Sequence, residues 1–70
     1  APADPHDLRQ VLAAAFGQRR KMLRGALRNL PCNTVALLER AGVSGHARAE
    51  ELDISEFCAL ARAFAELAEN

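Results

Sequence analysis

The spacing of apolar residues predicts that the chain is helical from its first residues onward. Asp4 is a natural N-cap, and Pro5 suits the first helical position, where a missing N–H costs nothing. Apolar residues then recur at helical intervals of three and four: Leu8, Val11, Leu12, Ala15 and Phe16. We expect Gly17 to end this helix in a left-handed conformation.

A second helix is predicted over residues 18–30, where Pro31 closes it. Its apolar side consists of Leu23, Ala26, Leu27 and Leu30. At 100° per residue, one flank beside this apolar side gathers Arg20, Lys21, Arg24 and Arg28. Arg19 falls nearer the core, where its aliphatic stem would cover apolar neighbours.

Two further helices and a short turn follow. The third helix begins near Asn33 and Thr34 and is expected to end at Gly42. Its apolar residues are Val35, Leu37, Leu38 and Ala41. Residues 44–46 read as a loop, and residues 48–52 as a short helical turn.

The last helix has the strongest pattern of the chain. Asp53 and Glu56 stand three residues apart before an apolar run, which is the spacing of a capping box. Its apolar stripe is Ile54, Phe57, Leu60, Ala61, Phe64, Leu67 and Ala68. Because no segment alternates in the manner of a strand, we predict an all-α fold, a small compact cluster of four or five short helices.

The length allows one domain with a small core, since the chain has 70 residues, of which 50% are hydrophobic. The chain opens with Ala-Pro-Ala-Asp-Pro and without Met. We therefore expect residues 1–4 to be a linker or the start of a fragment, and residues 5–70 to be a single helical domain, with other domains preceding it.

The charges are balanced overall but divided unequally along the chain. Residues 1–35 hold six Lys and Arg against two Asp, whereas residues 36–70 hold three Arg against seven Asp and Glu. Such asymmetry is typical of a protein with a polyanionic partner on one side. Three other interpretations stay open: a solvated face, a face neutralised by the acidic half of the same domain, and contact with an acidic protein surface.

The aromatic residues favour recognition of phosphates and shape over base stacking. Phe16, Phe57 and Phe64 all fall on core stripes, and the chain has no Tyr or Trp. This suits double-stranded or folded RNA, whose bases are hard to reach. A helix-turn-helix DNA binder is a weaker alternative, because the helix after the turn at 30–33 offers only Arg40 to DNA.

The chain lacks the residues that several classes of function require. The chain has no glycine-rich nucleotide loop, His46 lies in a loop, and no carboxylate pair suits acid/base catalysis, so this chain alone is not expected to be catalytic. Its two Cys and two His have no ligand spacing, so we expect no metal. Cys32 and Cys58 are predicted to be buried free thiols. With no apolar run of membrane-spanning length and no signal peptide, we expect a soluble, cytoplasmic protein.

One motif resembles a known family. Residues 16–27, FGQRRKMLRGAL, are similar to the F-x-Q-R-R-K-x-L-R-N-x-L signature at the start of the C-terminal helical domain of bacterial small-subunit rRNA adenine dimethyltransferases of the KsgA type. Residues 37–43 and 48–57 resemble the end of that domain, so the resemblance covers about residues 12–68. Gly25 stands where the family usually has Asn, and Gly45 where Pro is common.

The resemblance implies a fold, a cofactor and partners. Family enzymes carry an N-terminal Rossmann-like domain that binds S-adenosylmethionine, and they dimethylate two adjacent adenosines near the 3′ end of 16S rRNA. That catalytic domain, with its Asn-Leu-Pro-Tyr-type motif, is absent from this chain, where residues 29–31 match only by coincidence. We therefore expect no cofactor here, S-adenosylmethionine in the parent protein, and a monomer whose partners are the immature 30S subunit and its own catalytic domain.

The residues expected to contact RNA are Arg19, Arg20, Lys21, Arg24 and Arg28. Their role would be to bind phosphates and orient the protein, without reading sequence. The alternative is a helical protein-interaction module whose basic helix packs on an acidic partner domain and has no role with RNA.

Overall fold

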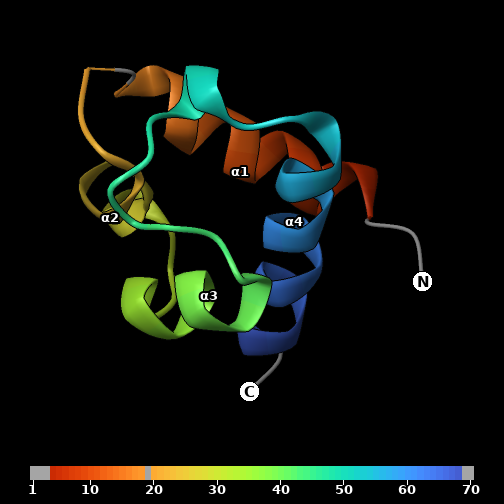
Figure 1. Cartoon of the computed structure of the whole chain (residues 1–70). Helices are drawn as coiled ribbons and strands as arrows, with labels where there is room; N and C mark the ends of the chain where they lie inside the picture. Colours follow the sequence, from red (N-terminus) through yellow and green to blue (C-terminus); the bar gives the residue numbers. More distant parts are fainter. Residues whose placement is uncertain (1–3, 19, 69–70) are drawn as a thin grey trace.

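The computed structural model describes residues 4–18 and 20–68, and this part of the chain contains helices and no strand (Figure 1). The elements, in order, are α1 (Pro5–Gly17), α2 (Leu23–Ala26), the 3₁₀ helix η1 (Leu27–Asn29), α3 (Thr34–Ala41), the 3₁₀ helix η2 (Ala49–Glu51) and α4 (Ile54–Ala68). The all-α prediction is confirmed. No helix of the described residues is long and apolar enough to cross a membrane.

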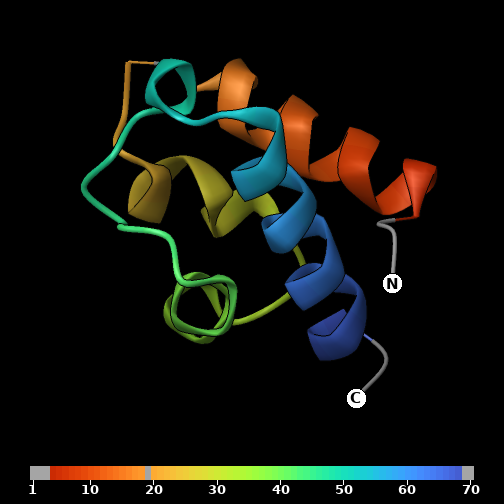
Figure 2. The same ribbon diagram turned by 45° about the vertical axis from the view of Figure 1, so that its right-hand side comes forward.

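Helix α4 is the centre of the packing. It lies against α1 at its start and against α3 further along, and α2 also packs on α1 (Figures 1 and 2). The apolar stripes of all four helices meet in one core. Its largest fully buried side chains are Leu23, Leu27, Leu37, Leu60 and Val11.

The predicted starts of α1 and α3 are confirmed by their caps. The Asp4 carboxylate accepts a hydrogen bond from the backbone N–H of His6 at 2.8 Å, with Pro5 in the first turn. The Asn33 side-chain oxygen accepts from the N–H of Ala36 at 3.1 Å. Each cap pairs a backbone donor that the helix itself leaves unpaired.

The capping box of α4 is also confirmed. The backbone N–H of Glu56 donates to Asp53 Oδ1 at 2.9 Å, and the N–H of Asp53 donates to Glu56 Oε1 at 3.2 Å. The two residues therefore satisfy one backbone donor each in a reciprocal way.

The glycine predictions separate into one that is confirmed and one that is wrong. Gly42 ends α3 at φ 72°, in the left-handed conformation, as predicted. Gly17 does not: α1 includes it, and the chain leaves the helix at Gln18, with φ −127° and ψ 47°. Among the described residues, Gly42 alone has a positive φ.

The prediction of one helix over residues 18–30 is wrong at its start. The helix begins at Leu23, after a turn in which the N–H of Lys21 donates to the carbonyl oxygen of Gln18 at 2.9 Å. A helix from residue 18 would bond the N–H of Leu23 to the carbonyl four residues before it. That N–H instead donates to Ala47 O at 2.8 Å, and the N–H of Arg24 donates to Gly45 O at 3.0 Å.

Three residues that the sequence placed on apolar stripes are largely exposed. Val35 and Ile54, in the first turns of α3 and α4, are 65% and 68% exposed. Phe16 is 48% exposed and lies with its ring centroid 5.6 Å from that of the buried Phe57. The prediction that both thiols are buried is corrected as well, since Cys32 and Cys58 are half-buried free cysteines.

Candidate nucleic-acid interface

Four of the five predicted contact residues lie between the end of α1 and the end of η1. Arg20 and Lys21 occupy the turn before α2, Arg24 lies in α2, and Arg28 lies in η1. All four side chains are exposed. The prediction that these four cations share one helix flank is wrong, because the helix starts after Lys21. Arg19 lies outside the described residues.

A hollow of about 320 Å³ brings three of these cations together with a fourth from the other half of the chain. Its lining residues are Arg20, Lys21, Met22, Arg24, Gly25 and Arg48. Arg48 directly precedes η2 and was missed by the sequence reasoning, because nothing local to it indicates proximity to residues 20–24. It follows Ala47, whose carbonyl oxygen holds the N–H of Leu23.

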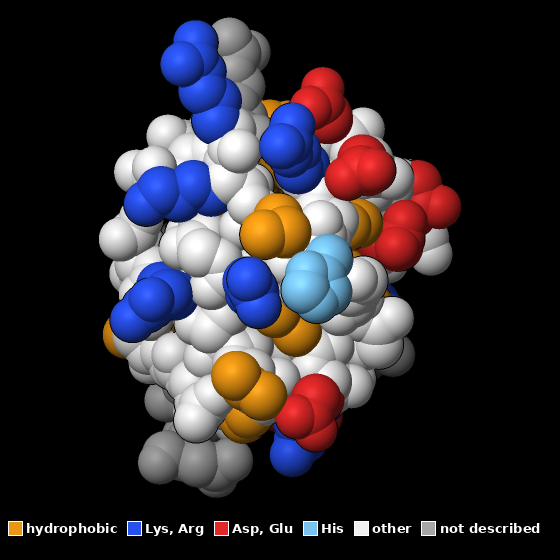
Figure 3. Space-filling model, turned by 60° about the vertical axis from the view of Figure 1, so that its left-hand side comes forward, with side chains coloured by type: hydrophobic (Ala, Val, Ile, Leu, Met, Phe, Trp, Pro, Cys, Tyr) orange, Lys and Arg blue, Asp and Glu red, His pale blue; other side chains and the backbone are white. Residues whose placement is uncertain are grey.

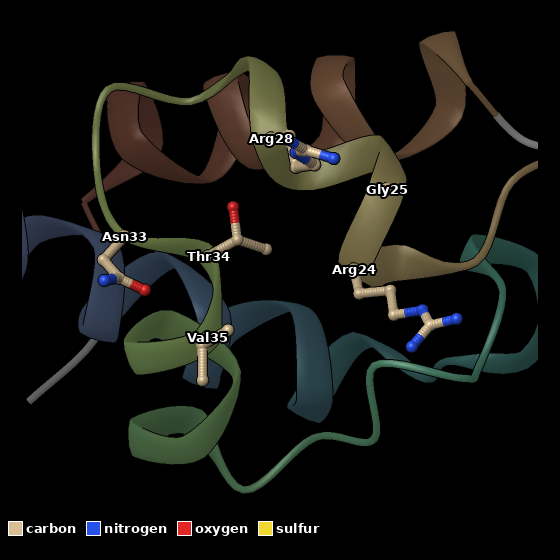
Figure 4. Close-up of a pocket in the computed structure, with 6 residues that line it drawn as sticks. All are labelled: Arg24, Gly25, Arg28, Asn33, Thr34 and Val35. Atoms are coloured by element: carbon tan, nitrogen blue, oxygen red, sulfur yellow. The ribbon is translucent and has the colours of Figure 1, made fainter.

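A second hollow, of about 600 Å³, lies between η1 and the start of α3 (Figure 4). Its lining residues are Arg24, Gly25, Arg28, Asn33, Thr34 and Val35. The two hollows share Arg24 and Gly25, so they adjoin. We call the set of cations around them the basic surface: Arg20, Lys21, Arg24, Arg28 and Arg48.

Among the described residues, the basic surface is not neutralised by contacts with the acidic half. Within residues 4–18 and 20–68, none of its five cations forms an ion pair, whereas Arg40 pairs with Glu66 at 3.4 Å. The carboxylate of Glu51 accepts from the backbone N–H of Arg48 at 2.7 Å rather than from its guanidinium. Lys and Arg side chains follow one side of the molecule, and Asp and Glu gather on the other side of the same view (Figure 3).

The chemistry of this surface is that of binding. Its side chains supply guanidinium and ammonium donors, and neither hollow is lined by a carboxylate or a thiol. Among the described residues, no group of three or more His, Cys, Asp or Glu could hold a metal ion. Burial raises the pKa of the Cys32 thiol above its usual value, which keeps it protonated at neutral pH.

Comparison with curated proteins identifies relatives of this chain. It is 55% identical over 64 residues to ribosomal RNA small subunit methyltransferase A of Paracoccus denitrificans, and 57% identical over 63 residues to the protein of the same name from Paramagnetospirillum magneticum. The Azorhizobium caulinodans protein of that name is 52% identical over 63 residues. These matches cover 90–91% of the chain. The chain is similar to one part of these proteins, in agreement with its resemblance to the C-terminal domain of their family.

The ribosomal RNA small subunit methyltransferase A proteins are much longer than this chain. The matched region spans 22–23% of the three relatives. No family model matches the chain. The identity of 52–57% to these relatives confirms the predicted resemblance. The matched region contains the whole basic surface.

Proposed function

We propose that this chain is the RNA-binding domain of a small-subunit rRNA adenine dimethyltransferase. In this proposal, residues 5–70 form the C-terminal domain, residues 1–4 belong to a linker, and the domain docks the enzyme on 16S rRNA in the immature 30S subunit. The parent protein, a cytoplasmic monomer, would use S-adenosylmethionine in its N-terminal catalytic domain to dimethylate two adjacent adenosines.

The observation that carries the proposal is the convergence of unpaired cations. Arg20, Lys21, Arg24 and Arg28 come from one segment and Arg48 from another, yet all five line two adjoining hollows without a carboxylate partner among the described residues. Like charges placed together repel, so the arrangement has a cost unless an anion is bound. The relatives are named ribosomal RNA methyltransferases, and ribosomal RNA is a polyanion that could bind these cations.

The proposed contacts act on the RNA backbone. Guanidinium groups match phosphate oxygens in a bidentate way, and phosphate contacts fix position and orientation without reading sequence. Arg19 belongs to the proposed set because it adjoins Arg20 in the chain. The domain would thus hold the enzyme on the subunit while the catalytic domain reaches its adenosines.

A salt titration of binding to immature 30S subunits tests the proposal. With about four phosphates neutralised, the logarithm of the binding constant should fall with the logarithm of salt at a slope of about −3. The triple variant Arg20→Ala, Arg24→Ala, Arg28→Ala should bind more weakly and flatten the slope. A control that removes the same charge from exposed positions outside the two hollows combines Arg9→Ala, Arg40→Ala and Arg62→Ala.

The outcomes separate the two hypotheses for the basic surface. Binding that only the first triple variant weakens supports the RNA role. Equal weakening by both variants would mean that overall charge, rather than this surface, is responsible. Absence of binding at low salt overturns the RNA role and favours the alternative, in which the basic surface contacts an acidic partner domain.

A further inference from the structure

The larger hollow has features that a phosphate contact does not require. We propose that it binds one unpaired nucleotide of the RNA, an inference that rests on the proposed RNA-binding function. Its volume of about 600 Å³ falls within the range of about 300–1,000 Å³ that is usual for ligand pockets.

The polar groups of the hollow are mostly hydrogen-bond donors. Arg28 contributes guanidinium N–H groups, which cannot accept, whereas the side chain of Arg24 runs away from Thr34 and Val35 (Figure 4). The Asn33 side-chain oxygen is already used by the N–H of Ala36, so its NH₂ group is what remains available. The hydroxyl of Thr34 points toward the segment that carries Arg28 (Figure 4). This donor-rich set fits a ligand rich in acceptors, as phosphate oxygens and base edges are.

The apolar part of the hollow distinguishes a nucleotide from a free phosphate. Val35 is 65% exposed at its edge, although an apolar β-branched side chain gains nothing from contact with water. Gly25 leaves the opposite wall without a side chain. A base or ribose could lie against these apolar surfaces, with a guanidinium plane as its stacking partner in place of an aromatic ring.

Val35 offers a way to change the larger hollow without changing charge. It lines the larger hollow and not the smaller one. Because its side chain is 65% exposed, shortening it should cost the fold little.

Two RNA duplexes, each made of two separate strands, test the proposal by fluorescence anisotropy. One is fully paired, and the other differs only by a single bulged nucleotide. The chain should bind the bulged duplex about fivefold or more tightly, as one well-placed set of base contacts provides. Val35→Ala should reduce this preference while the affinity for the paired duplex and the salt slope stay unchanged, since Val35 carries no charge. Thr34→Val, which removes only the hydroxyl, should reduce the preference as well.

Ile54→Ala is the matched control, since Ile54 is 68% exposed and lines neither hollow. It should keep the preference. Equal affinity of the unmodified chain for both duplexes overturns the nucleotide site and leaves the proposed function standing. A preference that survives in both Val35→Ala and Thr34→Val also overturns it. Binding to neither duplex nor to 30S subunits overturns both proposals.

Discussion

The backbone N–H of Arg24 donates to the carbonyl oxygen of Gly45 at 3.0 Å. With the adjacent bond from Leu23 to Ala47, this contact fixes the start of the basic segment against a loop from the acidic half of the chain. A Cβ on Gly45 would lie 3.2 Å from the Cβ of Arg24, so the two backbones approach closely. Arg48, the next residue after Ala47, is thereby placed beside the other cations.

Arg48 is expected to act as part of the basic surface, although it lies in the acidic half. Arg48→Ala should weaken binding to 30S subunits and reduce the steepness of the salt dependence by about 1, the effect of losing one phosphate contact. Arg62→Ala removes another exposed cation, on α4, and should leave the slope unchanged. Equal effects of the two substitutions would exclude a specific role for Arg48.

The two glycines at helix ends should respond to alanine in opposite directions. Gly42 has φ 72°, so Gly42→Ala should lower the free energy of unfolding by about 1–2 kcal/mol through left-handed strain. Gly17 lies within α1, with open space around a Cβ, so Gly17→Ala should raise it by up to about 1 kcal/mol. Urea denaturation measures both. A loss of stability in Gly17→Ala would contradict the helical conformation of Gly17.

Leu60 should be among the residues on which the fold most depends. Its side chain is fully buried in α4, between α1 and α3. Leu60→Ala should cost about 2–5 kcal/mol through lost burial and the cavity left behind, a large share of the stability of so small a domain. Ile54→Ala, in the same helix at a site 68% exposed, should cost less than about 0.5 kcal/mol. Similar unfolding midpoints for the two variants would contradict the described core.

The Cys32 thiol should make stability depend on pH in the alkaline range. Burial raises its pKa above the ordinary value of 9.0 in the folded chain. Below 9.0 the thiol is neutral in both states; as pH rises through 9.0 toward the raised value, ionisation favours the unfolded chain, so stability falls. Urea midpoints from neutral pH upward should show this decline in the unmodified chain and in Cys58→Ser. An equally steep decline in Cys32→Ser would assign it to another group.

The helix ends that depend on near neighbours in sequence could be predicted. Asn33 caps a donor three residues away, the Asp53–Glu56 pair spans three residues, and Gly42 follows its helix directly. In each case the partner atoms lie within one helical turn, so the residue types alone indicate the interaction. The same holds for the run of cations from Arg19 to Lys21, which is visible in the sequence itself.

The start of α2 could not be predicted, because residues about twenty positions away determine it. The N–H groups of Leu23 and Arg24 find their acceptors at Ala47 and Gly45, and no periodicity shows such a pairing. The position of Arg48 depends on the same contact, so the sequence alone left it out of the candidate site. Helical spacing also places Ile54 on the apolar stripe, although its side chain is 68% exposed, because spacing alone does not show which turns of a helix are covered by other elements.

The two hydrogen bonds that join residues 23–24 to residues 45–47 tie folding and ligand binding together. In the unfolded chain Arg48 is separated from the other cations, so the full anion-binding set exists only in the native state. By mass action, a polyanion that binds the native state alone must raise the melting temperature, by an amount that grows with its concentration. A small domain of modest stability would then be held together partly by the RNA that it is proposed to bind.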